Sequence, residues 1–123
     1  MMLSPHFAAA ELACRCGCGF GEKDEDVDLK LIELLEYMRV ESGEPIIINS
    51  GCRCLTHNFL AKGSENSAHL RGGAADISCI DSTKRWLLIN AALKWGCKRI
   101  GIGSSFVHVD VDETLPQRRV WTY

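Results

Sequence analysis

Residues 67–76 read SAHLRGGAAD, a segment that places a histidine in a loop and an aspartate on the strand that follows. Gly72 and Gly73 indicate a tight turn, after which Ala74–Ile80 reads as a short strand. Successive side chains of a strand point to opposite faces. One face therefore carries Ala74, Asp76 and Ser78, and the other carries Ala75, Ile77 and Cys79. The segment predicts a strand that holds one acidic side chain close to His69.

A second strand, expected at 106–111, offers another histidine. Its valines, at 107, 109 and 111, share one face, so His108 and Asp110 point together to the opposite face. A valine face in the core presents that pair toward a cleft. His69, Asp76 and His108 are normal zinc ligands, and three protein ligands leave a fourth position for water, as in catalytic sites. By itself, a histidine or aspartate on a strand is more often a satisfied polar residue.

The wider pattern S-x-H-x-x-G-x-A-x-D, followed by Val107-His108-Val109-Asp110, resembles the M15 family of zinc D-Ala-D-Ala peptidases. Residues 50–53 (SGCR) are similar to the family's S-G-Y-R, and 101–110 with Trp121 are similar to its closing segment. The resemblance covers the chain from about residue 45 onward, and the start more loosely. It implies an α+β fold of the hedgehog/DD-peptidase type, a small antiparallel sheet flanked by helices.

By this resemblance one Zn²⁺ is held by His69, Asp76 and His108, and Arg53 and Ser67 contact the substrate. A guanidinium can bind a terminal carboxylate through two hydrogen bonds or stabilise an oxyanion, so Arg53 is also a catalytic candidate. The implied activity is hydrolysis of peptidoglycan stem peptides, by a D-Ala-D-Ala carboxypeptidase or an L-Ala-D-Glu-type endopeptidase. The alternatives are a non-catalytic zinc module, as in the hedgehog signalling domain, and a phage structural component.

The proton acceptor is where the chain departs from the resemblance. Many family members place Glu, Asp or His three residues before the last zinc ligand, and this chain has Ser105 there. A serine cannot replace a carboxylate as general base. Asp110 is the best substitute because it shares a strand face with His108, and it can equally be a carboxylate that orients His69. Weaker candidates are Asp112, Glu113 and His57.

Length and charge restrict the class of protein. The chain has 123 residues, which fits one domain over 1–123. The 14 basic and 16 acidic residues give a net charge of −2, without the basic field of a nucleic-acid binder. Apolar runs are too short for a membrane span, and the N-terminus does not read as a secretory signal. We expect a protein that is cytoplasmic as synthesised, such as a phage endolysin that reaches the cell wall on lysis. The oligomeric state stays open.

The remaining elements follow from periodicity and end signals. Helices are expected at 4–13, from Val27 to the stop at Gly43, at 54–61, and from Asp81-Ser82 to Trp95. Strands are expected at 45–49, 74–80, 100–102 and 106–111. Residues 14–26 (CRCGCGFGEKDED) read as a turn-rich loop because glycine recurs in them.

Seven cysteines are many for this length. An odd count without a secretory signal argues against a disulfide framework, and C-x-C is a poor match to the usual C-x₂-C metal pair. The simplest interpretation makes Cys79 and Cys97 small core residues and lets the first five cysteines pack a glycine-rich turn. The alternatives are a second structural metal and a disulfide of the Cys14–Cys54 type.

Overall fold

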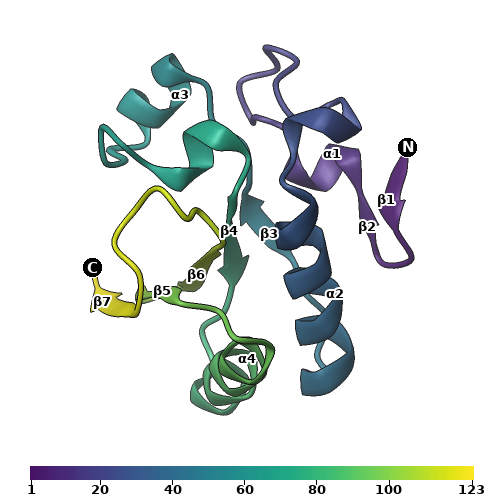
Figure 1. The fold of residues 1–123 in the computed structure, drawn as a ribbon, viewed down its shortest axis with the longest axis vertical. Coiled ribbons are helices and arrows are strands. Elements are labelled where there is room, and N and C mark those ends of the chain that lie inside the picture. The colour runs from purple at the N-terminus through teal and green to yellow at the C-terminus, as the bar shows by residue number, and fades with distance from the viewer.

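A five-stranded sheet forms the centre of the protein, whose computed structural model describes residues 1–123 (Figure 1). Its strands lie in the order β3-β4-β6-β5-β7, with bounds Ile48–Ser50 (β3), Ala74–Ser78 (β4), Arg99–Ile102 (β5), Phe106–Asp110 (β6) and Arg119–Thr122 (β7). Every neighbouring pair is antiparallel except β5 and β7, which run parallel. The predicted α+β class is confirmed, and β7 is an addition that the sequence pattern did not indicate.

Two long helices cover one side of the sheet. The helices are α1 (Ala9–Leu12), α2 (Leu29–Ser42), α3 (Leu55–Leu60) and α4 (Ser82–Trp95), with 3-10 turns η1 (Asp24–Asp26) and η2 (Ala68–Arg71). The Asp81 side chain accepts a hydrogen bond from the backbone of Lys84 at the start of α4. Gly43 and Gly96, with φ of 71° and 100°, end α2 and α4 in the left-handed conformation. None of these helices combines the length and apolar character needed to cross a membrane.

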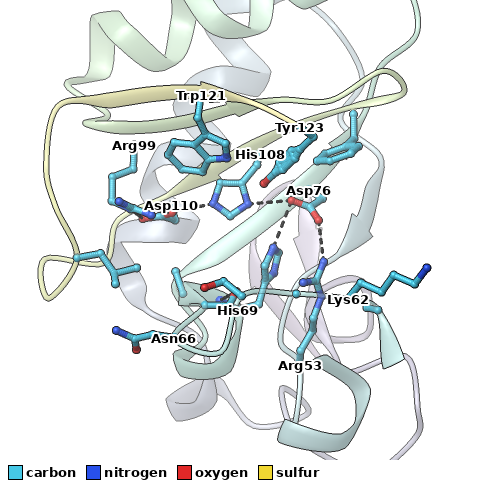
Figure 2. Close-up of a pocket in the computed structure, with 17 residues that line it drawn as sticks. Arg53, Lys62, Asn66, His69, Asp76, Arg99, His108, Asp110, Trp121 and Tyr123 are labelled. Carbon is cyan, nitrogen blue, oxygen red and sulfur yellow. Dashed lines mark hydrogen bonds and ion pairs between the residues drawn. The ribbon is translucent and has the colours of Figure 1, made fainter. Parts of the chain in front are cut away.

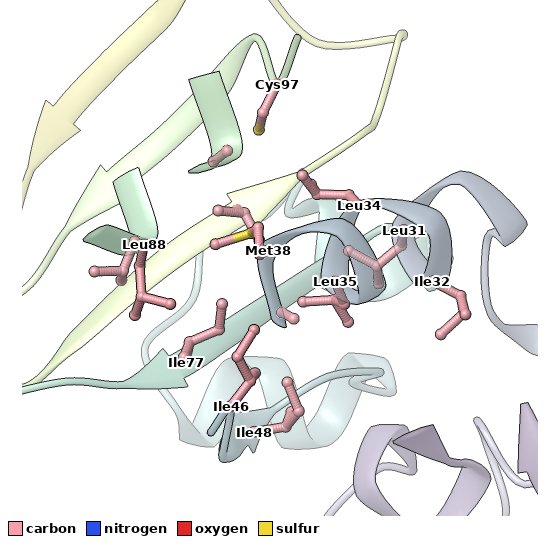
Figure 3. Packing of buried hydrophobic residues seen from close by; sticks show 14 of the residues in the cluster. Leu31, Ile32, Leu34, Leu35, Met38, Ile46, Ile48, Ile77, Leu88 and Cys97 are labelled. Atoms are coloured by element: carbon pink, nitrogen blue, oxygen red, sulfur yellow. The ribbon is translucent and has the colours of Figure 1, made fainter. Parts of the chain in front are cut away.

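The core lies between the sheet and the helices α2 and α4 (Figure 3). The sheet contributes its apolar face, which consists of Ala75, Ile77, Ile100, Val107 and Val109. Helix α2 contributes Leu31, Leu34, Leu35 and Met38, and α4 contributes Leu88, Ala91 and Ala92. Each buried Leu, Ile or Met side chain stabilises the fold by roughly 1.5–3 kcal/mol relative to exposure. This packing fixes which face of β4 and β6 is apolar, and so turns their polar side chains the other way.

The N-terminus differs from the prediction of a helix at 4–13. It forms a hairpin of β1 (Met2–Ser4) and β2 (Phe7–Ala8), followed by the single turn α1. Pro5 lies in the hairpin turn, where its fixed φ is as suitable as at a helix start. Ser4 does not cap a helix, because its hydroxyl donates to Glu36 on α2 at 2.6 Å. A tertiary partner therefore decides between two structures that the local sequence permits.

Candidate metal centre

Three side chains meet on the polar face of the sheet (Figure 2). Asp76 on β4 lies directly opposite His108 on β6 in the strand register, and His69 comes from η2, just before β4. Asp76 Oδ1 is 2.9 Å from His108 Nδ1 and 3.2 Å from His69 Nε2. One ligand atom from each residue lies within 4.8 Å of the other two. The three residues proposed from the sequence are thus brought together, two by strand pairing and one by the turn.

In each of the two imidazoles, the ring nitrogen that points away from Asp76 (the outer nitrogen) donates a hydrogen bond to an oxygen acceptor. His69 Nδ1 is 2.6 Å from the carbonyl oxygen of Gly51, and His108 Nε2 is 2.7 Å from Asp110 Oδ2. Each outer nitrogen must carry a proton to donate these hydrogen bonds, so in a neutral imidazole the inner nitrogen presents a lone pair toward Asp76. The inner nitrogen donates to Asp76 only when the ring takes up a second proton. Two imidazole lone pairs and a carboxylate oxygen that converge in a buried place repel one another unless a cation lies between them. The chemistry of the donor set therefore fits a divalent metal.

Local hydrogen bonds fix His69 before any ligand arrives. The Ser67 hydroxyl caps η2 by accepting from the His69 backbone N–H at 3.2 Å. The His69 carbonyl accepts from the backbone N–H of Arg53 at 2.9 Å. Gly72, with a φ of 71°, ends the turn, and a Cβ there would lie 1.9 Å from the Asp26 carbonyl oxygen. A left-handed backbone and the lack of room for a Cβ are both met only by glycine. This explains why the sequence motif has glycine at position 72.

The electrostatics keep Asp76 ionised. Burial alone raises the pKa of Asp76, but its hydrogen bonds with His108 and His69 outweigh burial and hold the pKa well below the usual range. Arg53 adds to this environment, since its Nη2 donates to Asp76 Oδ2 at 2.9 Å. Burial lowers the pKa of His108, but hydrogen bonds with Asp110 and Asp76 outweigh it and raise the pKa. The lowered pKa of Asp76 and the raised pKa of His108 both indicate that the electrostatic environment of the cluster favours positive charge at its centre.

The cluster forms part of the wall of a cavity of about 540 Å³. Arg53 and Ser67, predicted to contact substrate, also line it, as do Arg99, Trp121 and Tyr123. The Trp121 ring lies near His108, with centroids 5.3 Å apart. It folds over Gly101, where a Cβ would approach the indole nitrogen to 2.7 Å. The site thus opens into a space large enough for a small peptide segment.

The Asp110 carboxylate accepts several hydrogen bonds at once. It accepts from His108 Nε2, from Arg99 Nε at 2.8 and 3.0 Å, and from the backbone of Asp112 at 3.2 Å. The strand rise separates two residues on one face by about 7 Å along the backbone, yet the side chains of His108 and Asp110 lean together into a hydrogen bond. Asp110 contacts His108 rather than His69. Its role, as base or as positioning group, stays a prediction.

The weaker candidates for the base lie elsewhere. Asp112, Glu113 and His57 do not line the cavity, and neither does Ser105, which is exposed. Asp112 instead pairs with Arg71 at 2.5 Å, and Glu113 pairs with Lys30 at 3.0 Å on the surface. Among the carboxylates, only Asp76 and Asp110 reach the cavity.

The sequence reasoning missed the positions of Arg99 and Tyr123. Arg99 lies two residues before Gly101 on β5, so strand alternation places it on the polar face and was the available signal. Tyr123 had no such signal, because it follows the parallel strand β7, which shows no clear alternation. For Trp121 the only signal was its place in the segment that resembles the end of the family pattern.

An α+β fold that holds two histidines and an aspartate at the wall of an open cavity is the kind of arrangement that metal-dependent hydrolases use. The family model described as Peptidase M15 matches residues 5–112, and the chain belongs to this family of peptidases. A search among curated proteins found no match to the chain.

Proposed function

We propose that this protein is a zinc-dependent carboxypeptidase that removes the terminal D-alanine from peptidoglycan stem peptides ending in D-Ala-D-Ala. The observation that carries the proposal is the convergence of His69, Asp76 and His108 in the cavity wall, with each outer imidazole nitrogen held by an acceptor. Family membership supports a peptide substrate. Two imidazoles and a carboxylate suit Zn²⁺, which when bound polarises a carbonyl and makes water a stronger acid.

The charges of the cavity support a substrate with a free carboxyl terminus. Its lining contains the cations Arg53, Lys62 and Arg99 against the anions Asp76 and Asp110. Arg99 is committed to Asp110, and Asp76 is committed to the histidines and Arg53. Lys62 is exposed at the cavity. Lys62 is therefore the cation free to attract a peptide carboxylate. Arg53 is itself paired with Asp76 and also donates to Ser50 and Asn58. These bonds use three of its five N–H groups, so two remain to bind the carboxylate or to stabilise negative charge that develops on the scissile carbonyl.

Other groups of the site hold and orient the two histidines. Gly51 and Asp110 select the imidazole tautomers, and Ser67 fixes the turn that carries His69. Burial raises the pKa of Tyr123, so its phenol keeps its proton at neutral pH and can donate a hydrogen bond into the cavity. The hydrogen-bond commitments of Asp110 favour a positioning role over that of a proton acceptor.

The direct test is mass spectrometry of muropeptides incubated with the zinc-loaded protein. We expect loss of one terminal alanine from stems ending in D-Ala-D-Ala, and no reaction when the same terminus is amidated. Cleavage inside the stem, indifferent to amidation, would instead indicate an endopeptidase. No change in any stem peptide with zinc bound would contradict peptidase activity.

Arg53 gives the matched variant. Arg53→Lys keeps the charge but cannot form the proposed two-pronged hydrogen bond to the substrate carboxylate. We expect kcat/KM to fall about 10–100-fold, because a charge-assisted hydrogen bond contributes about 1.5–3 kcal/mol. Arg71→Lys is the control, since Arg71 lies close in sequence to His69 but pairs with Asp112 outside the cavity. Equal losses in the two variants would remove Arg53 from substrate binding.

The second candidate function is a non-catalytic zinc module. Two features favour it. Ser105 stands three residues before His108, where many family members have an acidic residue or a histidine. In addition, the carboxylates of Asp76 and Asp110 are both already paired with arginine and histidine side chains. The muropeptide experiment separates the two, because a module binds zinc without any turnover.

A further inference from the structure

Four cysteines gather at a second place in the molecule, outside the cavity. Three lie on the loop after α1 and one precedes α3, and they are Cys14, Cys16, Cys18 and Cys54. We call this group the four-cysteine cluster. One sulfur from each lies within 4.8 Å of all the others, and all four cysteines are free of disulfides. Neither simple packing nor a disulfide therefore describes the group completely.

Two of the distances between sulfurs are close to those of a tetrahedral zinc site. Cys16 Sγ is 3.4 Å from Cys14 Sγ and 3.6 Å from Cys54 Sγ. A tetrahedral zinc with Zn–S bonds of about 2.3 Å separates its sulfurs by about 3.8 Å, whereas a disulfide joins them at about 2.0 Å. The observed distances lie close to the first value.

The loop is bent so that cysteines at alternate positions face one centre. In an extended strand, alternate residues lie about 7 Å apart, too far to share one ion. Here the backbone turns at Gly17 and Gly19, with φ of 80° and 98°, values that glycine adopts readily. The Gly17 N–H donates to the Cys14 carbonyl at 3.2 Å, and the Cys14 N–H donates to the Phe20 carbonyl at 2.8 Å. These turns convert the C-x-C-x-C spacing into a chelating loop.

Backbone N–H groups also point at the sulfurs. The Cys54 N–H donates to Cys14 Sγ at 3.4 Å, and the His57 N–H donates to Cys54 Sγ at 3.4 Å. Such bonds stabilise the thiolate form that metals require. Arg15 fixes the loop to the rest of the fold, since its guanidinium donates to the backbone carbonyls of Glu11 and Ile48 at 2.8 and 2.9 Å.

Hydrophobic packing does not explain the gathering. Cys16 and Cys18 are exposed and gain no burial from meeting other thiols. Cys79 and Cys97 show what packing alone produces, because both are buried in the apolar core and their thiols approach the carbonyls of Asp81 and Arg99. The packing interpretation thus describes Cys79, Cys97 and the buried Cys52. It does not account for the exposed Cys16 and Cys18.

We propose that the four-cysteine cluster binds one Zn²⁺ as a closed structural site. Four thiolates fill a tetrahedral coordination shell and leave no open position, and each thiol releases its proton to solvent as the metal binds. The ion would join the N-terminal loop to the residue that follows Arg53, whose side chain contacts Asp76. The second metal therefore steadies one wall of the cavity without taking part in the reaction there. This inference concerns residues that do not line the cavity, and it stands independently of the proposed function.

The test counts metal ions by native mass spectrometry and elemental analysis of protein reconstituted with zinc. We expect two zinc ions per chain in the wild type, one in Cys16→Ser/Cys18→Ser and one in His108→Ala. Cys79→Ala is the control and should keep two. One zinc in the wild type, unchanged in the double serine variant, would overturn the proposal.

Two measurements do not depend on folding of the double variant. With Co²⁺ in place of zinc, His108→Ala should show the near-ultraviolet thiolate-to-cobalt charge-transfer band, which histidine and carboxylate ligands do not produce. An organomercurial that titrates thiols should release one zinc equivalent from the wild type. Absence of the band together with no released zinc would contradict a thiolate site even if the serine variant proved insoluble.

Discussion

The His69–Asp76–His108 site and the four-cysteine cluster gather metal-binding groups in different ways. Asp76 and His108 stand opposite each other on paired strands, and each imidazole is held by a further hydrogen bond. The cysteines lie mainly on a glycine-bent loop, and two of them are exposed. A site built on a sheet keeps its geometry without an ion and can leave a coordination position open for chemistry. A site built on a loop gains much of its order from the ion that closes it.

The largest expected effect separates activity from stability. If the cavity binds zinc as proposed, His108→Ala should reduce peptidase activity by about 10³-fold or more, because the proposed site loses one of its three ligands. It should change the thermal midpoint less than Cys16→Ser/Cys18→Ser does, since the hydrogen bonds between β4 and β6 remain. The measurements are turnover on a D-Ala-D-Ala peptide and thermal unfolding in the presence of zinc.

The double serine variant supplies the contrast. We expect a zinc chelator to lower its thermal midpoint much less than it lowers that of the wild type, because only the cavity zinc remains to be removed, while turnover remains far above that of His108→Ala. If His108→Ala instead abolished the chelator's effect on the midpoint, the assignment of open and closed roles would be reversed.

The next largest effect is expected on zinc affinity when Asp110 is replaced. Asp110→Asn leaves a group that can still accept from His108 but removes the negative charge that faces Arg99. We expect zinc affinity at the cavity to fall about 10–100-fold, the usual effect of losing a partner that orients a metal ligand. Saturating zinc should restore most of the turnover. The measurements are competition with a chromophoric chelator and kcat at high zinc.

This experiment also decides between the two predicted roles of Asp110. A general base cannot be replaced by more metal, so kcat that stays low at saturating zinc would favour the base. Asp112→Asn is the matched control, because Asp112 is two residues further on and pairs with Arg71 outside the cavity.

The sequence was sufficient where a pattern repeats along a regular element. Alternation on 74–80 and 106–111 was enough to place Asp76 and His108 on one face, and the helical spacing with Gly43 placed α2. It was not sufficient where the deciding partner is distant. Ser4-Pro5 suits a helix start and a turn equally, and Glu36 on α2 settles the choice. Likewise, spacing alone could not show that two glycines bend the loop toward Cys54.

The smallest effect concerns how the N-terminal hairpin is held on α2. Glu36 accepts from the Ser4 hydroxyl at 2.6 Å and from the His6 backbone at 2.7 Å. Burial raises the pKa of Glu36, but its hydrogen bonds with Ser4 and His6 outweigh burial and lower the pKa. A carboxyl with a lowered pKa stabilises the fold above its unfolded value of about 4.3, and this contribution is lost as pH falls through the folded pKa.

Glu36→Gln should therefore reduce the free energy of unfolding by about 1 kcal/mol at pH 7 and by progressively less between about pH 5 and pH 3. Urea denaturation across this range measures the difference. Acid also protonates thiolates and releases metal, so the comparison belongs in the Cys16→Ser/Cys18→Ser background, where the cysteine contribution is absent from both proteins. A difference that stays constant with pH would show that the Glu36 contacts do not depend on its charge. A difference that exists only with the cysteines intact would show that the hairpin and the cysteine loop stabilise each other, so that the two regions could not be treated as independent.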